Sequence, residues 1–209
     1  MSQELFKAIQ QHDTAQVKAL LTRGANPNEA QQEWPGLLPL QVAIHALAHG
    51  GELAVLLALL EHGADVNAWD SERDRTPLLE AVCENQTAAV ELLLKAGAEP
   101  NVRSSEGDTP LRACAEVGNV AMATLLLDAG ATRTLNDWGG LTGCTALGIA
   151  ISRLDLPMMR LLLDAGADPE ATDDDRQPTR DRLPPRDESD APIWDAAFKM
   201  LGGTKGGPP

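Results

Sequence analysis

Two histidines at helical spacing are the residues of this chain that most directly suggest metal chemistry. His45 and His49 stand four positions apart, so a helix would bring them to one face, and His62 or Glu52 could supply a further ligand. No HExxH or CxxC sequence accompanies the pair. Because one helical pair is a weak signal, we expect surface histidines here and no bound metal.

A glycine-rich stretch and a cysteine are the other candidates for chemistry. Residues 139 to 145, GGLTGCT, precede an expected helix as a phosphate-binding loop would, but they lack the lysine with which such a loop holds phosphate. Cys83 has no histidine, asparagine or aspartate that the sequence places beside it, and no GxSxG motif is present. We therefore expect no catalytic residue, no cofactor and no enzymatic activity.

Tryptophans offer a different chemistry, that of molecular contact. Trp34, Trp69 and Trp138 fall outside the apolar stripes of the expected helices. Tryptophan is enriched at the energetic centres of protein interfaces, because it buries a large area with few rotatable bonds. Each indole could instead fold back onto the chain beside it, so partner contact and internal packing both stay open.

Acidic side chains accompany these tryptophans. Asp70, Glu72 and Asp74 follow Trp69, and a later segment carries Glu106 and Asp108. The formal net charge of the chain is −14, which argues against nucleic acid as a partner and favours a basic one. The same acidity would also keep an alanine- and leucine-rich protein in solution, so that explanation remains beside the first.

A sequence repeat supplies the elements that hold these residues. A Gly-Ala pair recurs at intervals of 33 to 39 residues, with its glycine at Gly24, Gly63, Gly97, Gly130 and Gly166. In TPLLEAVCENQTAAVELLLKAGAEPN (76–101), Thr76 and Pro77 favour the start of one helix and Gly97 favours the end of a second. Two helices this short cannot bury both apolar faces against each other, so the sequence predicts a stack of such units.

These units resemble the ankyrin repeat. TPLLEA occurs at 76, with the variants TPLRAC at 109, LPLQVA at 38 and TALGIA at 145, and each leads to a helix that ends in a form of LLLxAGADxN. The resemblance covers about residues 3 to 201. It implies an all-α repeat solenoid with β-hairpin fingers between repeats, about five repeats and a C-terminal half repeat.

The resemblance also implies where a partner would bind. In this family the binding surface is usually the concave one, made of fingertips and first helices, and the ends of those helices here carry Cys83, Glu84, Glu116, Val117, Ser152 and Arg153. The residues that we predict to bind a partner are Trp34, Trp69, Asp70, Glu72, Asp74, Glu80, Glu84, Glu106, Asp108, Glu116, Trp138 and Arg153.

Departures from the repeat length predict extra local structure. An excess of four residues around 43–52 fits one extra helical turn, and the fingers at 29–38 and 136–144 are also long. Residues 171–190 are rich in charge and proline and almost lack apolar side chains, so we expect a mobile inserted finger loop.

The remaining boundaries follow from the same register. Residues 192–201 fit the first helix of a half repeat, which would close the apolar end of the stack. We expect a single repeat domain over residues 1–201 and a flexible tail over 202–209.

The cellular compartment is predicted mainly from features that the sequence lacks. Met1 is followed at once by the first repeat, so we expect no secretory signal, and the longest apolar run, residues 53–60, is too short to cross a bilayer. Three cysteines, of which Cys114 takes a core position, favour a reducing compartment. We expect a cytoplasmic protein that is monomeric when free.

The function predicted from the sequence is non-catalytic binding of another protein through an acidic, tryptophan-bearing surface. A sharper alternative is a dedicated inhibitor, such as an immunity protein or antitoxin, of a basic toxin or nucleic-acid-processing enzyme. Two further hypotheses are a host-directed bacterial effector and a metal-dependent enzyme that uses His45, His49 and the glycine-rich finger.

Overall fold

Pairs of short antiparallel helices follow one another along the chain. The computed structural model describes residues 1–31, 36–70 and 74–203, so Trp34 and Glu72 lie outside the described residues. The helices of these residues are α1 (Ser2–Gln10), α2 (Thr14–Thr22), α3 (Pro39–Leu47), α4 (Leu53–Glu61), α5 (Pro77–Cys83), α6 (Thr87–Lys95), α7 (Pro110–Val117), α8 (Val120–Asp128), α9 (Ala146–Ser152), α10 (Leu156–Asp164), η1 (Thr179–Arg182) and α11 (Ala191–Met200).

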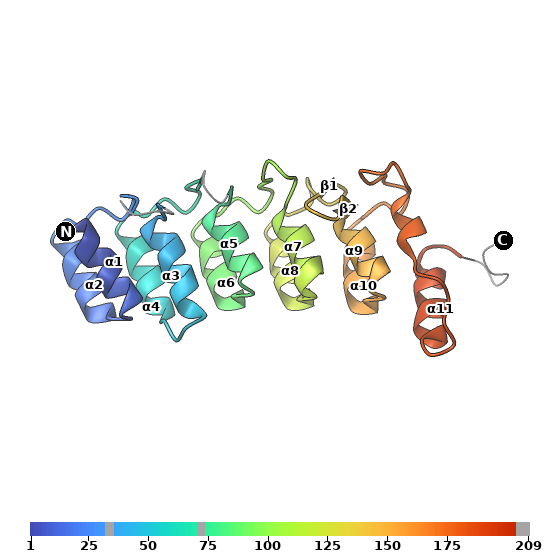
Figure 1. Cartoon of the computed structure of the whole chain (residues 1–209), viewed down its shortest axis with the longest axis horizontal. Coiled ribbons are helices and arrows are strands. Elements are labelled where there is room, and N and C mark those ends of the chain that lie inside the picture. Colours follow the sequence, from blue (N-terminus) through green and yellow to red (C-terminus); the bar gives the residue numbers. More distant parts are fainter. Residues whose placement is uncertain (32–35, 71–73, 204–209) are drawn as a thin grey trace. The chain divides into compact units, whose positions relative to one another are not determined.

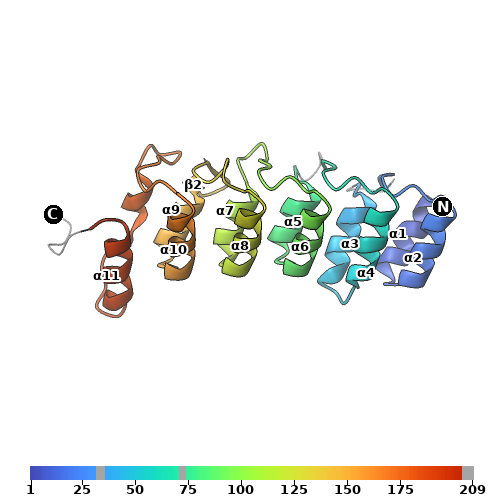
Figure 2. The same cartoon turned by 180° about the vertical axis from the view of Figure 1, so that it is seen from behind.

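The chain divides into two compact units, Met1–Pro100 and Asn101–Pro209, and the single repeat domain expected over residues 1–201 stays a prediction. In the first unit the pairs α1/α2, α3/α4 and α5/α6 lie side by side, first helix on first helix and second on second (Figure 1). In the second unit α7/α8 pack on α9/α10 in the same way, and α11 packs on α10 (Figure 2). The paired-helix repeats predicted from the sequence are confirmed.

The first helices begin where threonine caps were expected. The hydroxyls of Thr76, Thr109 and Thr145 accept hydrogen bonds from backbone amides three residues later, at 3.3, 3.2 and 3.0 Å. Pro77 and Pro110 occupy the first helical position of α5 and α7, where the missing N–H costs nothing. Each cap satisfies an amide that the helix itself leaves without an acceptor.

The helices α2, α4, α6, α8 and α10 each end two residues before the repeated glycine. The φ angles of these glycines lie between 85° and 96°, a left-handed conformation that a side chain would strain. The helices bury aliphatic stripes, and Leu78, Ala81, Val82, Val90 and Leu93 are all essentially inaccessible. The core is therefore made of many small aliphatic contacts between neighbouring pairs.

Asparagine side chains join one repeat to the next. Asn28 donates from Nδ2 to the carbonyl of Gly63 and accepts at Oδ1 from the amide of Asp65, both at 2.8 Å. The equivalent bonds join Asn67 to Gly97 and Glu99 in the first unit, and Asn101 to Gly130 and Arg133 in the second. Each asparagine thus satisfies two backbone groups just beyond a second helix, where no helical partner exists.

Fingers project from one end of the helix pairs within each unit. One is a hairpin in which β1 (Trp138–Gly139) pairs with β2 (Cys144–Thr145), in the register Trp138 to Thr145. Isolated bridges join Asp70 to Arg75 and Thr172 to Pro178 in two other fingers. The sequence prediction of hairpin fingers is confirmed.

The lengthened second repeat differs in detail from its prediction. Helix α3 has 9 residues against 7 in α5, so the excess adds two helical residues and not a full turn. The rest of the excess forms a turn in which the amide of Gly51 bonds to the carbonyl of Ala46 at 2.8 Å.

The inserted finger, residues 171–190, holds more structure than its composition predicts. Helix η1 packs against α9, and the buried hydroxyl of Thr179 donates to the carbonyl of Ala171 at 2.8 Å. Part of the segment expected as a mobile loop, residues 179–182, is thus a helix packed on α9. Mobility stays a prediction for the exposed residues 185–190.

The C-terminal helix α11 is held by this finger. The indole nitrogen of Trp194, which is buried, donates to the carbonyl of Pro184 at 2.6 Å. The Trp194 ring also stacks on Phe198 with centroids 5.0 Å apart. The fourth tryptophan is thus a packing residue of the half repeat.

A buried carboxylate, Asp173, organises the inserted finger. Its Oδ1 accepts from the amide of Gln177 at 2.9 Å and its Oδ2 from Nε of Arg182 at 2.6 Å. Burial by itself opposes ionisation, but the bonds from Gln177 and Arg182 together outweigh it and lower the pKa of Asp173 below its ordinary value of 3.8.

Replacing Asp173 by asparagine should lower the free energy of unfolding by about 1–3 kcal/mol at pH 7, because the amide cannot pair with the charge of Arg182. A pKa that is lowered in the folded state stabilises the fold above the ordinary value, and that stabilisation is lost as the pH falls through the folded value. Urea unfolding should thus show a smaller difference between parent and variant at about pH 3 than at pH 7.

The matched control is Asp175→Asn, since Asp175 also contacts Arg182, at 3.0 Å, but is largely exposed. It should cost no more than about 1 kcal/mol. An equal loss from both variants, or one that does not change with pH, would contradict the role given to Asp173.

Candidate functional site

The hairpin of the second unit presents two large apolar side chains to solvent. Trp138, in β1, is 40% exposed, and Leu141, at the hairpin tip, is 99% exposed. Both belong to the finger that is longer than the repeat requires. Apolar groups presented in this way cost free energy in water, which a partner that covered them would recover.

Glycines fix the position of this hairpin against the preceding finger. The amide of Gly140 donates to the carbonyl of Glu106 at 2.7 Å. A Cβ added at Gly139 would lie 2.2 Å from the carbonyl oxygen of Gly107, so the two backbones meet at a distance that excludes any side chain. The hairpin is therefore held by backbone contact.

A buried arginine connects the hairpin to helix α7. Arg112 is 1% exposed. Its guanidinium pairs with Asp108 and with Glu116, the latter at 2.6 Å, and donates to the hydroxyl of Thr142 in the hairpin at 3.2 Å. Both carboxylates remain partly exposed, and since one cation holds two anions, this cluster keeps a net negative charge at the surface.

The exposed indole is also held from the side. Arg103 donates to the carbonyl of Trp138 at 3.1 Å and to Asp137 at 3.3 Å. Its guanidinium carbon lies 5.8 Å from the centroid of the Trp138 ring, within the range of a cation–π contact. The ring therefore packs on its own chain and still offers a large exposed area, so contact with a partner stays a prediction for this tryptophan.

We call Trp138, Leu141, Glu106, Asp108 and Glu116 the hairpin patch. The sequence pointed to four of these residues and missed Leu141. The sequence could have indicated Leu141, because it is the one large apolar residue in the glycine-rich stretch 139–145. Arg112 was also missed, because an arginine in a first helix carries no mark of burial in the sequence.

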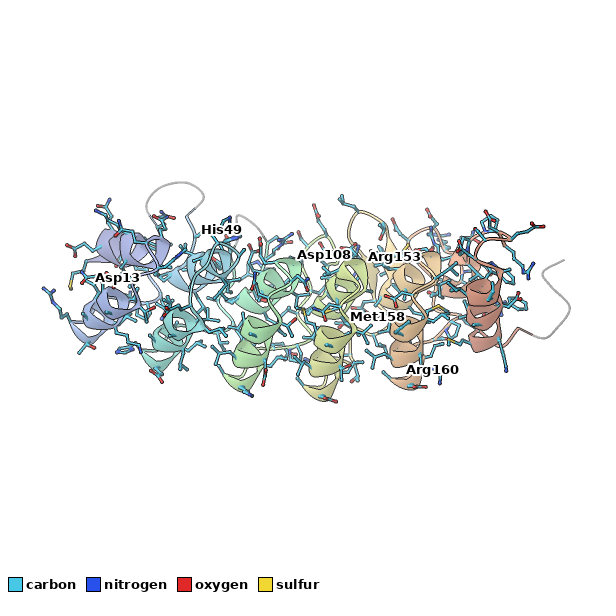
Figure 3. The ribbon with its side chains drawn as sticks, turned by 90° about the horizontal axis from the view of Figure 1, so that it is seen from below. Asp13, His49, Asp108, Arg153, Met158 and Arg160 are labelled. Atoms are coloured by element: carbon cyan, nitrogen blue, oxygen red, sulfur yellow. The ribbon has the colours of Figure 1, made fainter. Side chains whose placement is uncertain are left out.

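Arg153 lies near the patch in the second unit. It follows α9 and donates to the main-chain carbonyl of Glu116, at the end of α7. Figure 3 shows Asp108 and Arg153 on the side of the first helices α7 and α9, whereas Arg160 lies on the opposite side with α10. Arg153 thus helps to join two repeats at the surface that carries the patch.

The residues of the first unit that were predicted to bind a partner fall into an exposed group and a buried group. Trp69 is 43% exposed, and Asp74 and Glu84 are half-buried. Asp70 and Glu80, in contrast, are only 6% and 1% exposed. Asp70 and Glu80 cannot contact a partner directly, so we withdraw both from the predicted binding surface.

The histidines and the glycine-rich stretch were the two alternatives that would have indicated a metal or phosphate site. Nδ1 of His49 lies 3.1 Å from the carbonyl of His45, and Nδ1 of His62 lies 2.8 Å from that of Ala58. Within the part of the chain that the structure describes, neither ring belongs to a group of three donors close enough to share one ion. The glycine-rich stretch forms the hairpin, not a phosphate loop before a helix.

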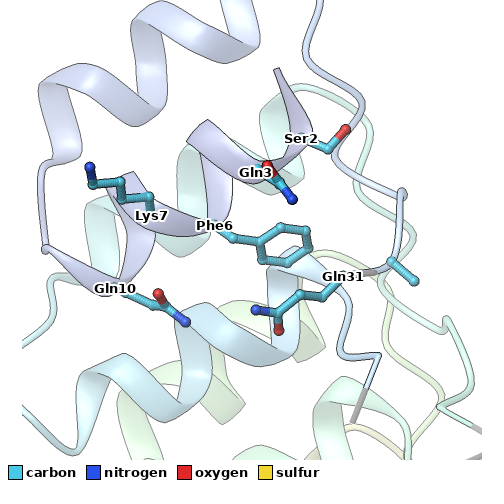
Figure 4. A pocket seen from close by; sticks show the side chains of 7 residues that line it. Ser2, Gln3, Phe6, Lys7, Gln10 and Gln31 are labelled. Atoms are coloured by element: carbon cyan, nitrogen blue, oxygen red, sulfur yellow. The ribbon is translucent and has the colours of Figure 1, made fainter. Parts of the chain in front are cut away.

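A small hollow lies near the N-terminus. It has a volume of about 240 Å³ and lies over Phe6, beside the side chains of Gln3, Gln10 and Gln31 (Figure 4). Its seven lining residues include no carboxylate, so it does not share the chemistry of the hairpin patch.

A family model described as ankyrin repeats (3 copies) matches residues 5–104 and 90–173 of this chain. Among solved structures, the ankyrin repeat domain of Bcl-3, described as a unique member of the IκB protein family, superimposes with a TM-score of 0.77 at 26% identity. That match covers 95% of this chain and 81% of the other. Within the described residues no helix has the length and apolar character needed to span a membrane.

Curated relatives match over parts of much longer proteins. The human transient receptor potential cation channel subfamily A member 1 is 31% identical over 78% of this chain, which is 14% of the channel protein. The mouse B-cell lymphoma 3 protein homolog is 35% identical over 62% of this chain and 27% of its own length. A putative ankyrin repeat-containing protein of Treponema pallidum is 38% identical over 44% of this chain and 31% of its own.

Replacing Arg112 by methionine should lower the free energy of unfolding by about 1–3 kcal/mol, because Asp108 and Glu116 lose their shared cation and the hairpin loses the bond to Thr142. The loss should stay below that of a fully buried pair, since both carboxylates are partly solvated. Urea unfolding of the whole chain measures it.

The matched control is Arg103→Met, which removes a surface pair and should cost no more than about 1 kcal/mol. If Arg112→Met proved as stable as the parent while Arg103→Met did not, Arg112 would not be the residue that joins the hairpin to α7.

Proposed function

The chain belongs to the ankyrin-repeat family, and from that membership we propose that it is a non-catalytic module that binds another protein through the hairpin patch. Ankyrin repeats generally mediate protein–protein interaction, and the fold is typically an interaction module without catalysis. The chain spans 14% and 27% of the lengths of the channel protein and the B-cell lymphoma 3 homolog that it matches.

The observation that carries the proposal is the exposure of Trp138 and Leu141 beside the carboxylates of Asp108 and Glu116. A fixed aromatic anchor surrounded by polar groups is the usual composition of an interface hot spot. Arg103 and Arg112 hold the patch before binding, so less conformational entropy is lost when a partner covers it.

The chemistry of the patch favours a basic partner. Two carboxylates held by one guanidinium leave a net negative charge, and Glu106 adds another exposed carboxylate. The formal charge of −14 would speed encounter with a cationic surface through long-range attraction. In the first unit, Trp69, Asp74 and Glu84 are proposed to add similar contacts.

A second candidate is a dedicated inhibitor, such as an immunity protein or antitoxin, that covers a basic toxin or nucleic-acid-processing enzyme. The high negative charge supports it, because a groove that binds nucleic acid is itself positively charged. We propose a cytoplasmic protein that is monomeric when free for either role.

Trp138→Ala should weaken binding by about 2 kcal/mol, or about thirtyfold in the dissociation constant, without loss of helix content. The partner is first isolated by affinity purification with mass spectrometry, and affinities are then measured by surface plasmon resonance. Leu57→Ser on α4 is the control, because Leu57 is similarly exposed at 44% but lies on a second helix. Its affinity should equal that of the parent.

The charge contribution is measured with Glu106→Lys, and Asp128→Lys at the end of α8 serves as its control. The first should slow association mainly at low salt, since ions screen a surface charge. Unchanged binding by both Trp138→Ala and Glu106→Lys would exclude the hairpin patch. An enzyme partner that is inactivated at a one-to-one ratio would favour the inhibitor over a general scaffold.

A further inference from the structure

Three side chains that can bind a metal converge in the first unit, away from the hairpin patch. Nε2 of His45 lies 2.6 Å from Oε1 of Glu80, and Nδ1 of His45 lies 3.3 Å from Oε1 of Glu84. One ligand atom from each of the three residues lies within 4.8 Å of the other two. From the sequence we considered only His49 and two further residues as companions of His45 and expected no metal. In the fold, His45 lies beside two carboxylates of the next repeat.

The helices set this geometry. His45 stands in the last turn of α3, and Glu80 lies within α5, which packs directly on α3. Glu84 follows α5 four positions after Glu80, so both carboxylates share one helix face. The three donors are therefore positioned by two packed helices and not by a loop.

Burial gives the cluster a closed side and an open side. Glu80 is 1% exposed, whereas the side chains of His45 and Glu84 are 27% and 33% exposed. The other oxygen of Glu80 lies 3.3 Å from Nη1 of Arg75. A second partner of this kind is what orients a carboxylate ligand in protein metal sites, and the open side leaves room for water as a further ligand.

We propose that His45, Glu80 and Glu84 bind a divalent transition metal ion, with Zn²⁺ as the best fit. One imidazole nitrogen and two carboxylate oxygens are ligands that Zn²⁺ accepts, with bonds of about 2.0–2.2 Å, and tetrahedral bonds of that length place donors about 3.3 Å apart. The three donor atoms lie within 4.8 Å of one another, so an ion on one ring nitrogen requires the partly exposed Glu84 to turn toward it. Ca²⁺ and Mg²⁺ fit less well, because they prefer more oxygen ligands and no imidazole.

Without metal, the same groups form a network of polar contacts, in which the two ring nitrogens of His45 face Glu80 and Glu84, and Arg75 pairs with Glu80. A bound ion would take the lone pair of one imidazole nitrogen, so the ring would bind in its neutral form. The two arrangements differ by one ion, which makes them separable by experiment. The proposal does not depend on the hairpin patch or on any partner.

The test uses the full chain after dialysis against a chelator and then against metal-free buffer. Titration calorimetry with ZnCl₂ should show one ion per chain with a micromolar dissociation constant, and the thermal midpoint should rise with added Zn²⁺. His45→Gln and Glu84→Gln should each weaken binding at least tenfold. His49→Gln should bind as the parent does, because its ring faces its own helix.

Circular dichroism of each variant separates loss of metal from loss of fold, and Glu84→Gln keeps the test valid if His45→Gln unfolds, since Glu84 is partly exposed. No stoichiometric Zn²⁺ in the parent would overturn the proposal in favour of the network of polar contacts. Equal binding by the parent and both ligand variants would overturn it in favour of adventitious binding to surface carboxylates.

Discussion

Burial of the apolar faces of very short helices is the constraint on which the rest of the structure depends. Most of the paired helices have only 7 to 9 residues, and a pair of that size cannot cover its own aliphatic stripe. Each pair is covered by its neighbours within a unit, and asparagine amides such as that of Asn28 satisfy the backbone groups that the helix ends leave without partners. Apolar contact thus supplies the stability of the stack, and these hydrogen bonds set its register.

Because the stack rests on the helices, the fingers are free to differ between repeats. The hairpin around Leu141 and the inserted finger around Asp173 use that freedom in opposite ways. The first presents apolar side chains to solvent, whereas the second turns back to pack on α9 and, through Pro184, to hold Trp194. A finger longer than the repeat requires therefore differs from the other fingers. Its contacts show whether the extra residues serve binding or stability.

The sequence was a reliable guide to features set by local rules. Threonine caps, the left-handed glycine after each second helix and the aliphatic stripes all act over a few residues, so a single repeat such as 76–101 already displays them. Pairings between repeats could not be predicted in the same way. Glu80 was predicted to bind a partner, yet it is buried against two neighbouring segments, where it contacts His45 of α3 and Arg75 of its own finger. Arg112 and Leu141 were missed because their roles depend on which finger meets which helix.

The central claim is that the hairpin patch contacts a partner protein, and site-specific photo-crosslinking from the hairpin tip tests it most directly. A benzophenone amino acid in place of Leu141 puts the probe on a side chain with no packing role, so the fold is not disturbed. The same probe at Leu57, on α4, is the matched control. In cells of the source organism the account predicts one crosslinked protein from position 141 and none from position 57. A crosslink to the co-purifying partner from position 57 alone would contradict it.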